Sequence, residues 1–422
     1  MPTETHNTQP PPDSQLARSQ SLLRRVFQAL SYRDFRILWL GAFTSTVGTW
    51  MQKVAQSWLV LTFTGSAFLL GLDAFLGDLP ILLFSLIGGV VADRMERRHL
   101  LLISQYLQMT FAFVLAALIY FNKVSIWQIL LLSFLTGTAQ AFGGPAYQAL
   151  IPTLVEKKDL PNAIAMNSIQ FNLARIIGPV AAGLAFAALG AAACFLLNGL
   201  SFLAVILSLS ILKKGLGPPA TKRNLLAELR DGLSFVREHR TLRILSFLAF
   251  CSTFFGLPLI TMLPIFAREV FQLGAKGYSI LLACTGLGAV LGALIVAILG
   301  NSPRKGTVAL SLQLFFGAMI VLFSLSRVLW FSLCTLFLAG IALVAVFALV
   351  SSLVQLQAPE SLRGRVMSIY MVAFRGGMPL GSLVTGFLAS HLPPTGVMAG
   401  NGLLLGAVAG MFLLLRARVE LD

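Results

Sequence analysis

Long apolar segments separated by short polar joints run through the chain from about residue 36 to residue 416. A helix needs ~20 apolar residues to cross the hydrocarbon core of a bilayer, and each of these segments is long enough. The pattern predicts an all-α polytopic membrane protein with twelve transmembrane helices. They are expected at 36–62, 66–92, 99–121, 126–151, 163–188, 190–212, 241–267, 277–300, 306–325, 329–353, 364–390 and 396–416.

The second six segments repeat the first six. Arg175 and Pro179 of the fifth segment match Arg375 and Pro379 of the eleventh at one constant spacing. Both copies have the same orientation, so we expect two six-helix bundles related by an axis along the membrane normal. The predicted divisions are a cytoplasmic tail at 1–35, an N-terminal bundle at 36–212, a cytoplasmic linker at 213–240 and a C-terminal bundle at 241–418.

The N-terminal tail carries two separate signals. Residues 1–18 are polar and contain three consecutive prolines, which is typical of a disordered segment. No signal peptide is expected, because the first apolar run comes late and lacks a small-residue cleavage site. Residues 21–33 predict either a short amphipathic helix on the membrane surface or an extension of the first helix.

Lys and Arg residues are distributed unevenly over the joints between segments. Of the 31 in the chain, only Lys123, Arg268, Lys276 and Arg327 lie at joints on one side. Three lie within segments, and the others lie in the tails and the joints of the opposite side. Positive charge accumulates on the cytoplasmic side of membrane proteins, so we expect both termini in the cytoplasm of a bacterial inner membrane.

Composition supports a membrane protein and argues against other classes. Apolar residues make up 57% of the chain and charged residues 11%, against about 25% charged in soluble domains. The net charge of +15 does not indicate nucleic-acid binding, because the basic residues lie at segment ends rather than in one patch interleaved with aromatic residues. The four cysteines lie within apolar runs without metal-ligand spacing, so neither a metal site nor a disulfide is expected.

No arrangement typical of an enzyme is present in the sequence. There is no Gly-rich loop ending in Lys for a nucleotide phosphate, and no histidine has a nucleophile beside it. We therefore expect no enzymatic activity and no cofactor. Because ATP is not the energy source, the proton gradient is the default driving force for transport.

The joint after the second segment resembles a known signature. Gly89, Asp93, Arg94, Arg97 and Arg98 follow the loop 2–3 pattern of the major facilitator superfamily of secondary transporters, with Glu96 where that family usually has Gly. The resemblance implies that Asp93 faces the cytoplasmic start of the eleventh helix and latches a cytoplasmic gate. An acid is favoured at a helix N-terminus. For Arg97 and Arg98 a plain topological role is the preferred interpretation.

Three longer stretches are similar to the branch that contains siderophore (enterobactin-type) and macrolide exporters. They are the run from Gly48 to Ser66, the run from Leu79 to Arg98, and the run from Pro145 to Pro179. The resemblance covers nearly the whole chain beyond residue 33. It implies efflux by alternating access, with protons exchanged for a small amphipathic molecule, a drug or a siderophore-like compound.

Five charged residues lie at membrane depth, where a charge costs ~2.5–3.5 kcal/mol and usually faces a cavity or a partner. Lys53 and Asp73 lie at similar depth, which predicts a proton-exchanging pair, a structural ion pair, or a lysine that extends to the outer surface. In the superfamily, helices 2 and 11 face each other. The resemblance therefore implies that Asp78 and Arg375 meet in one access state, and pairing of each within its own half is the alternative.

Arg175 precedes Gly178, Pro179 and Gly183 on the fifth segment, where small residues and a proline allow close, bent packing. This run resembles the helix-5 antiporter motif of proton-driven exporters, although Ala182 stands in place of a second glycine. A gating role and simple tight packing are both open interpretations.

The superfamily resemblance also implies a substrate cavity lined by helices 1, 4, 7 and 10. The candidate lining residues are Gln52, Gln56, Gln140, Phe142, Tyr147, Phe254, Phe255, Met262, Gln355 and Gln357. The expected partners are a small-molecule substrate, protons and the lipid bilayer, with no nucleic acid and a monomeric chain. Import or flipping of a lipid-like or nutrient molecule is the alternative function, and a non-transporting membrane sensor is a further one.

Overall fold

The computed structural model describes residues 27–212, 225–299, 304–360 and 362–415. These residues form helices and connecting turns, which confirms the all-α prediction. The N-terminal half contains a short 3-10 turn, η1 (Gln28–Ser31), and six long helices. These are α2 (Arg33–Thr64), α3 (Ala67–Arg94), α4 (Arg97–Tyr120), α5 (Ile126–Leu150), α6 (Leu160–Leu189) and α7 (Ala191–Ile211).

The C-terminal half begins after α8 (Leu225–Glu238), which falls in the stretch expected to link the halves. Its first span is broken into α9 (Arg240–Cys251), the π-helical turn η4 (Ser252–Gly256), α10 (Pro258–Ile265) and the π-helical turn η5 (Phe266–Val270). Pro258 and the two π-helical turns account for its irregular course. The remaining helices are α11 (Ala275–Leu299), α12 (Lys305–Leu325), α13 (Leu329–Gln357), α14 (Arg363–Ala389) and α15 (Pro394–Leu414).

Eleven helical spans of the described chain are long and apolar enough to cross a membrane. The first expected span, α2, is not one of them, because Lys53 and many Ser, Thr, Gly and Gln residues lower its mean hydropathy. It nevertheless runs the length of the N-terminal bundle beside α6 and α7. The eleven spans together with α2 are consistent with the twelve-helix prediction.

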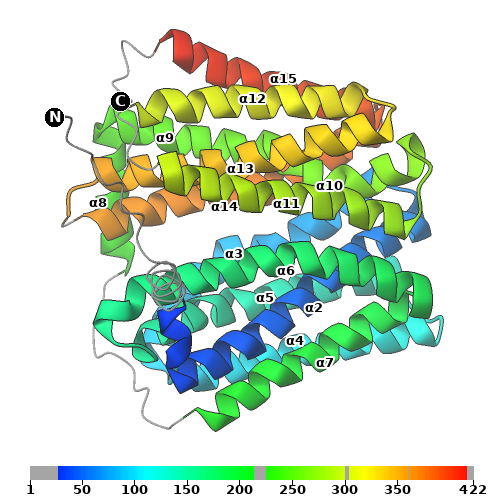
Figure 1. Ribbon diagram of the computed structural model, residues 1–422, viewed down its shortest axis with the longest axis horizontal. Helices are drawn as coiled ribbons and strands as arrows, with labels where there is room; N and C mark the ends of the chain where they lie inside the picture. The colour runs from blue at the N-terminus through cyan, green and yellow to red at the C-terminus, as the bar shows by residue number, and fades with distance from the viewer. Residues whose placement is uncertain (1–26, 213–224, 300–303, 361, 416–422) are drawn as a thin grey trace, which may run out of the picture.

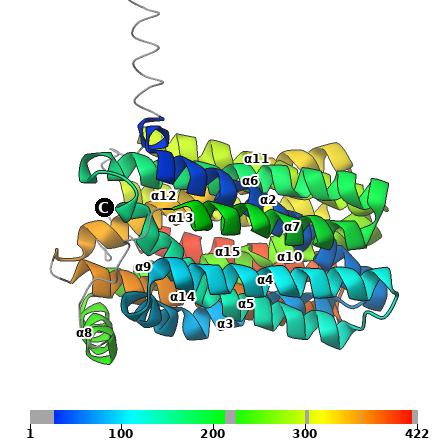
Figure 2. The ribbon, with the colours of Figure 1, turned by 90° about the horizontal axis from the view of Figure 1, so that it is seen from below.

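The helices form two bundles that lie side by side (Figure 1). Within the N-terminal bundle α3 packs on α5 and α2 packs on α7, and within the C-terminal bundle α12 packs on α15 and α11 packs on α13. The bundles contact each other mainly through α3 against α14 and α6 against α11. We call the end that carries α8 the linker end, and the end that carries the turn at Gly65 the hairpin end; Figure 2 shows α8 at one extremity.

The buried apolar residues show where the two bundles join. One core cluster contains residues of both bundles near the hairpin end, among them Leu61, Leu70 and Phe195 from one bundle and Phe266 and Tyr278 from the other. At the linker end each bundle instead has a core of its own. The bundles are therefore packed together at the hairpin end and separately packed at the linker end.

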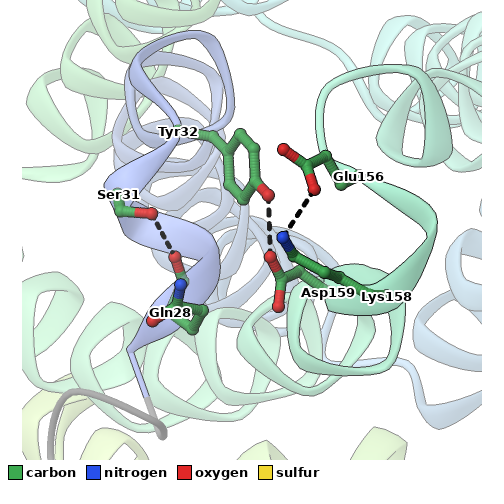
Figure 3. A network of polar contacts seen from close by, with 6 residues as sticks. All are labelled: Gln28, Ser31, Tyr32, Glu156, Lys158 and Asp159. Carbon is green, nitrogen blue, oxygen red and sulfur yellow. Dashed lines mark hydrogen bonds and ion pairs between the residues drawn. The ribbon is translucent and has the colours of Figure 1, made fainter.

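The start of α2 is tied to the start of α6 by polar contacts (Figure 3). The Tyr32 hydroxyl donates to Asp159 Oδ2 at 2.7 Å. Ala29 N also donates to Asn162 Oδ1 at 2.8 Å. Beside them Lys158 Nζ lies 2.7 Å from Glu156 Oε2. Residues 21–26 of the amphipathic helix expected at 21–33 lie outside the described residues, and the described remainder is the 3-10 turn η1 followed by Tyr32 and the first residue of α2.

Candidate functional site: a central polar cavity

A cavity of about 710 Å3 lies among the linker-end halves of the helices of the N-terminal bundle. All six helices α2 to α7 contribute to its wall, and Arg375 of α14 closes it from the other bundle. Amides and hydroxyls dominate the polar part of the lining: Ser45, Thr46, Thr49, Ser85, Gln105, Gln108, Gln140, Tyr147, Gln148, Asn167, Ser168, Gln170 and Asn172.

Three charged side chains line this cavity, one from each of three helices. They are Lys53 of α2, Asp78 of α3 and Arg375 of α14. Lys53 and Arg375 are exposed and Asp78 is half-buried, so all three reach the cavity space. Within the described chain none of them forms a hydrogen bond or an ion pair. The expected contact between Asp78 and Arg375 is therefore not made in this conformation, although both side chains line one cavity.

The indole ring of Trp50 lies close to two cationic side chains, those of Lys53 and Arg175. Lys53 Nζ lies 5.5 Å from the centre of the indole ring and Arg175 Cζ lies 5.8 Å from it. Phe171 packs edge-on to the same ring at 6.0 Å between centroids. A cation within about 6 Å of a tryptophan face is attracted by the ring quadrupole. Arg175 and Arg375 occupy matching places in the two repeats, but only Arg375 lines the cavity.

Asp73 does not pair with Lys53, which corrects the first of the expected arrangements. Its carboxylate accepts hydrogen bonds from Gln56 Nε2 at 2.9 and 3.0 Å and from Ser133 Oγ at 2.5 Å. Gln56 Nε2 also donates to Ser133 Oγ at 2.7 Å. The side chain is 6% exposed, so Asp73 is a buried acid held by two neutral donors.

Two of the ten candidate cavity residues, Gln140 and Tyr147, line the cavity. The Tyr147 hydroxyl donates to Asn167 Oδ1 at 2.9 Å. Gln52 instead accepts a hydrogen bond from Asn198 Nδ2, and Gln56 holds Asp73.

The other candidates lie away from the cavity. Phe142 packs on the linker-end core of its own bundle. Phe254 and Phe255 pack on each other, Met262 is fully buried in the hairpin-end core, and Gln355 and Gln357 are exposed at the linker end of α13. The described cavity is thus walled mainly by the N-terminal bundle rather than by helices 1, 4, 7 and 10.

The glycines of the helix-5 motif pack in two directions. A Cβ on Gly178 would collide with the Trp50 side chain of α2, whereas a Cβ on Gly183 would lie 3.0 Å from Ser279 Cβ of α11. Gly183 therefore permits close contact between the bundles, and Gly178 permits it within one bundle. Pro179 lies buried between them.

The arginines of the loop 2–3 motif hold helix ends. Arg97 Nη1 donates to Ala149 O at 3.0 Å, and Arg98 donates to Leu212 O at 3.2 Å and Ser210 O at 3.0 Å. These carbonyls belong to the last turns of α5 and α7, where a cation is favoured.

Arg94 is exposed, and the side chain of Asp93 lies outside the described residues. A Cβ on Gly89 would meet open space, whereas one on Gly88 would collide with Ala141 O of α5.

Several cavity residues were not proposed from the sequence. Gln105 and Gln108 lie on one side of α4, and Asn167 and Gln170 lie on one side of α6. Gln170 Nε2 donates to Thr46 Oγ1 at 2.9 Å and links α6 to α2. The sequence does contain a signal for these cavity residues, namely pairs of amide side chains three residues apart in apolar helices. Such side chains lie on one side of a helix and face a partner or water in a membrane.

Two bundles of spanning helices, with a polar cavity walled mainly by the N-terminal one and reached by Arg375 of the other, are typical of a multi-pass membrane transporter of the major facilitator type. The chain belongs to the family described as transmembrane secretion effector, whose model matches residues 25–422. It is 29% identical over 356 residues to a staphyloferrin A transporter of Staphylococcus aureus, covering 83% of this chain and 88% of that protein. It is 27% identical over 390 residues to the multidrug efflux pump Tap of Mycolicibacterium fortuitum, covering 89% and 95%.

Solved structures show the same fold at low identity. A bacterial homolog to the human lysosomal transporter Spinster, in an inward-facing and unoccupied conformation, aligns with a TM-score of 0.72 at 16% identity. The alignment covers 93% of this chain and 97% of that one. The matched proteins are transporters rather than enzymes, so this chain is a membrane transporter of small molecules.

Proposed function

We propose that this protein exports a small amphipathic molecule, a drug or a siderophore-like compound, from the cytoplasm by alternating access in exchange for protons. The linker end is then the cytoplasmic side of a bacterial inner membrane, and both termini are cytoplasmic. The positive-inside rule supports this orientation, since exposed Arg94, Arg363 and Arg243 lie at the linker end. Relatives named as siderophore and drug transporters support the substrate class. We take the monomer as the working unit.

The central cavity is the observation that carries this proposal. It is closed toward the hairpin end by inter-bundle contacts, including Trp58 stacked on Tyr278 and Arg268 Nη1 bonded to Leu61 O at 2.9 Å. Toward the linker end a smaller pocket of about 250 Å3 continues along α14 from Arg375 to Gly364. This arrangement supports loading from the cytoplasm and later release on the opposite side.

Asp73 is our candidate for the proton-carrying group. An ionised carboxylate at membrane depth without a cation beside it is costly, and its two donors, Gln56 and Ser133, are neutral. Gln56 lies one helical turn from Lys53 on α2, so a rotation or tilt of α2 changes the surroundings of both Asp73 and the cavity cation. Exchange of a proton at Asp73 would thereby be linked to the conformation of the cavity.

The test uses inverted membrane vesicles, in which export appears as accumulation. We expect an imposed pH gradient, acidic inside, to drive uptake of at least one compound from a panel containing staphyloferrin A, enterobactin and a macrolide. Asp73→Asn keeps the acceptor for Gln56 but carries no proton, so it should abolish gradient-driven accumulation and retain substrate exchange. Glu269→Gln, an exposed acid at the hairpin end, is the matched control. Undiminished gradient-driven accumulation by Asp73→Asn would contradict the proton role.

Flipping of a lipid-like molecule is the second candidate. The smaller pocket between α3 and α14 favours it, because Leu82, Met367, Met371 and Val372 give that pocket an apolar wall. Movement of a fluorescent phospholipid across the vesicle membrane, independent of a pH gradient and retained by Asp73→Asn, would favour this function over efflux of soluble compounds.

A further inference from the structure

We propose that the cavity selects cargo with an anionic group, and that Lys53 and Arg375 bind this group from the two bundles. The inference rests on the proposed export function and specifies the charge of its cargo. Efflux substrates include neutral, cationic and anionic compounds, so the charge of the preferred cargo is a distinct question. The geometry of the cavity answers it in favour of a carboxylate or a similar anion.

The charged groups facing the cavity give it a net positive charge. Lys53 comes from α2, Asp78 from α3 and Arg375 from α14, whereas the lining residues of α4, α5, α6 and α7 are uncharged. Arg175 of α6 adds a further cation behind Trp50. The lining therefore holds two cations and one carboxylate, and Arg175 lies against Trp50, the ring that also contacts Lys53.

The two lining cations are available to a ligand. In the described part of the chain neither Lys53 nor Arg375 has an ion pair or a hydrogen bond, and both side chains are exposed in the cavity. A cation at membrane depth normally pairs or faces water. Structural ion pairs would have satisfied Lys53 and Arg375 against Asp73 and Asp78, yet Asp73 is bound by Gln56 and Ser133 instead.

The rest of the wall suits the body of such a cargo. Trp50 and Phe171 form an aromatic corner beside Lys53, and the amides of Gln105 and Gln140 line the same space. An anion bound between Lys53 and Arg375 would contact both bundles at once, because Arg375 is the lining residue from the C-terminal bundle. Asp78 would then act as the internal anion that competes with the cargo for the two cations.

The test compares two probes that share an aromatic body and differ in charge, 4-(1-pyrenyl)butyrate and 4-(1-pyrenyl)butanol. Their affinities for the full chain in nanodiscs are measured by fluorescence anisotropy, with empty nanodiscs as the background. We expect the butyrate to bind more tightly than the butanol. Lys53→Gln and Arg375→Gln should each lower the butyrate-to-butanol affinity ratio about tenfold, the lower end of effects measured for close charge pairs. Asp78→Asn should raise that ratio.

Exposed cations at the hairpin end provide matched controls. Lys123→Gln and Arg327→Gln make the same chemical change outside the cavity and should leave the ratio unchanged. Binding of the butanol shows that each variant is folded. A variant that has lost its preference for the butyrate can therefore be distinguished from one that has unfolded. A ratio that is unaffected by Lys53→Gln and Arg375→Gln, or a wild-type preference for the butanol, would overturn the inference. The vesicle assay measures export independently of these affinities, so a failure of the anion preference can be distinguished from a failure of the proposed export function.

Discussion

The contact between α3 and α14 at the hairpin end predicts how a single methyl group shifts the protein between its access states. Gly386 lies against the start of α3, and a Cβ at this position would lie 2.7 Å from Ala67 O and 3.0 Å from Gly71 Cα. Ordinary contacts begin near 3.4 Å. Gly386→Ala therefore forces an overlap of about 0.7 Å with a backbone atom that no side-chain rotation relieves.

The free-energy effect follows from where this overlap occurs. Overpacking in a tight interior costs ~1–3 kcal/mol. In the proposed alternating-access cycle α3 and α14 separate at the hairpin end when the linker end closes, so the overlap would exist only in the state described here. Destabilising one of two states by this amount shifts their ratio by about 5–150-fold. We expect Gly386→Ala to raise the population that is open at the hairpin end.

Spin labels placed at residues 123 and 327, exposed hairpin-end positions of the two bundles, would report this shift as a longer distance distribution. Gly400→Ala is the first control, because its Cβ meets open space while it gains the same helix propensity. Gly340→Ala is the second control. Its Cβ would collide with Thr285 O inside the C-terminal bundle, so it should lower thermal stability without changing the distances. A wild-type distribution for Gly386→Ala would refute the reasoning.

Three further expectations concern polar contacts. Arg98→Gln should lower the free energy of unfolding by about 1.5 kcal/mol, because charged donors to the last turn of α7 are lost. Arg94→Gln, at an exposed position, should leave the free energy of unfolding unchanged. Thermal unfolding in detergent measures both variants. Gln56→Leu should destabilise the fold by ~1–3 kcal/mol by removing a donor from a buried carboxylate, measured in the same way. The hydrogen bond to Asp159 raises the pKa of Tyr32 above its ordinary 10.0. The stabilisation that this bond gives to the N-terminal contact is therefore complete below pH 10 and is lost as the pH rises through the raised pKa. Proteolysis of the N-terminal segment should increase at that pH, and it should already be increased at neutral pH in Tyr32→Phe.

The all-α class and the approximate course of the long helices were predictable because they depend on local sequence. Apolar length sets a membrane span, and the repeat of Arg175 by Arg375 indicated two related bundles. Buried charges were also identifiable, since any ionisable residue within an apolar segment is conspicuous. The broken course from α9 to η5 was less predictable, because π-helical turns leave little trace in the hydrophobic pattern.

Partners of the charged residues at membrane depth were not predictable, because they depend on how each helix is rotated. Lys53 and Gln56 are three residues apart, which separates them by about 60° around α2 and ~4.5 Å along it. Depth alone therefore could not show that Gln56, rather than Lys53, faces Asp73. The arginines of loop 2–3 posed the same problem, since Arg98 reaches α7, a helix more than a hundred residues away in the chain.

The two ends of the protein are stabilised in different ways, and this difference indicates where the bundles pivot. At the hairpin end aromatic pairs such as Phe68 with Phe387 join the bundles. At the linker end Arg97 and Arg98 bond within one bundle and leave the other free. Between the ends, a Cβ on Gly376 would be in ordinary contact with Leu82 at 3.7 Å, and beyond this point the pocket along α14 opens. Leu82 thus lies at the boundary between the packed part of the α3–α14 contact and the pocket, and in the proposed cycle the apolar wall of this pocket would come together when the linker end closes.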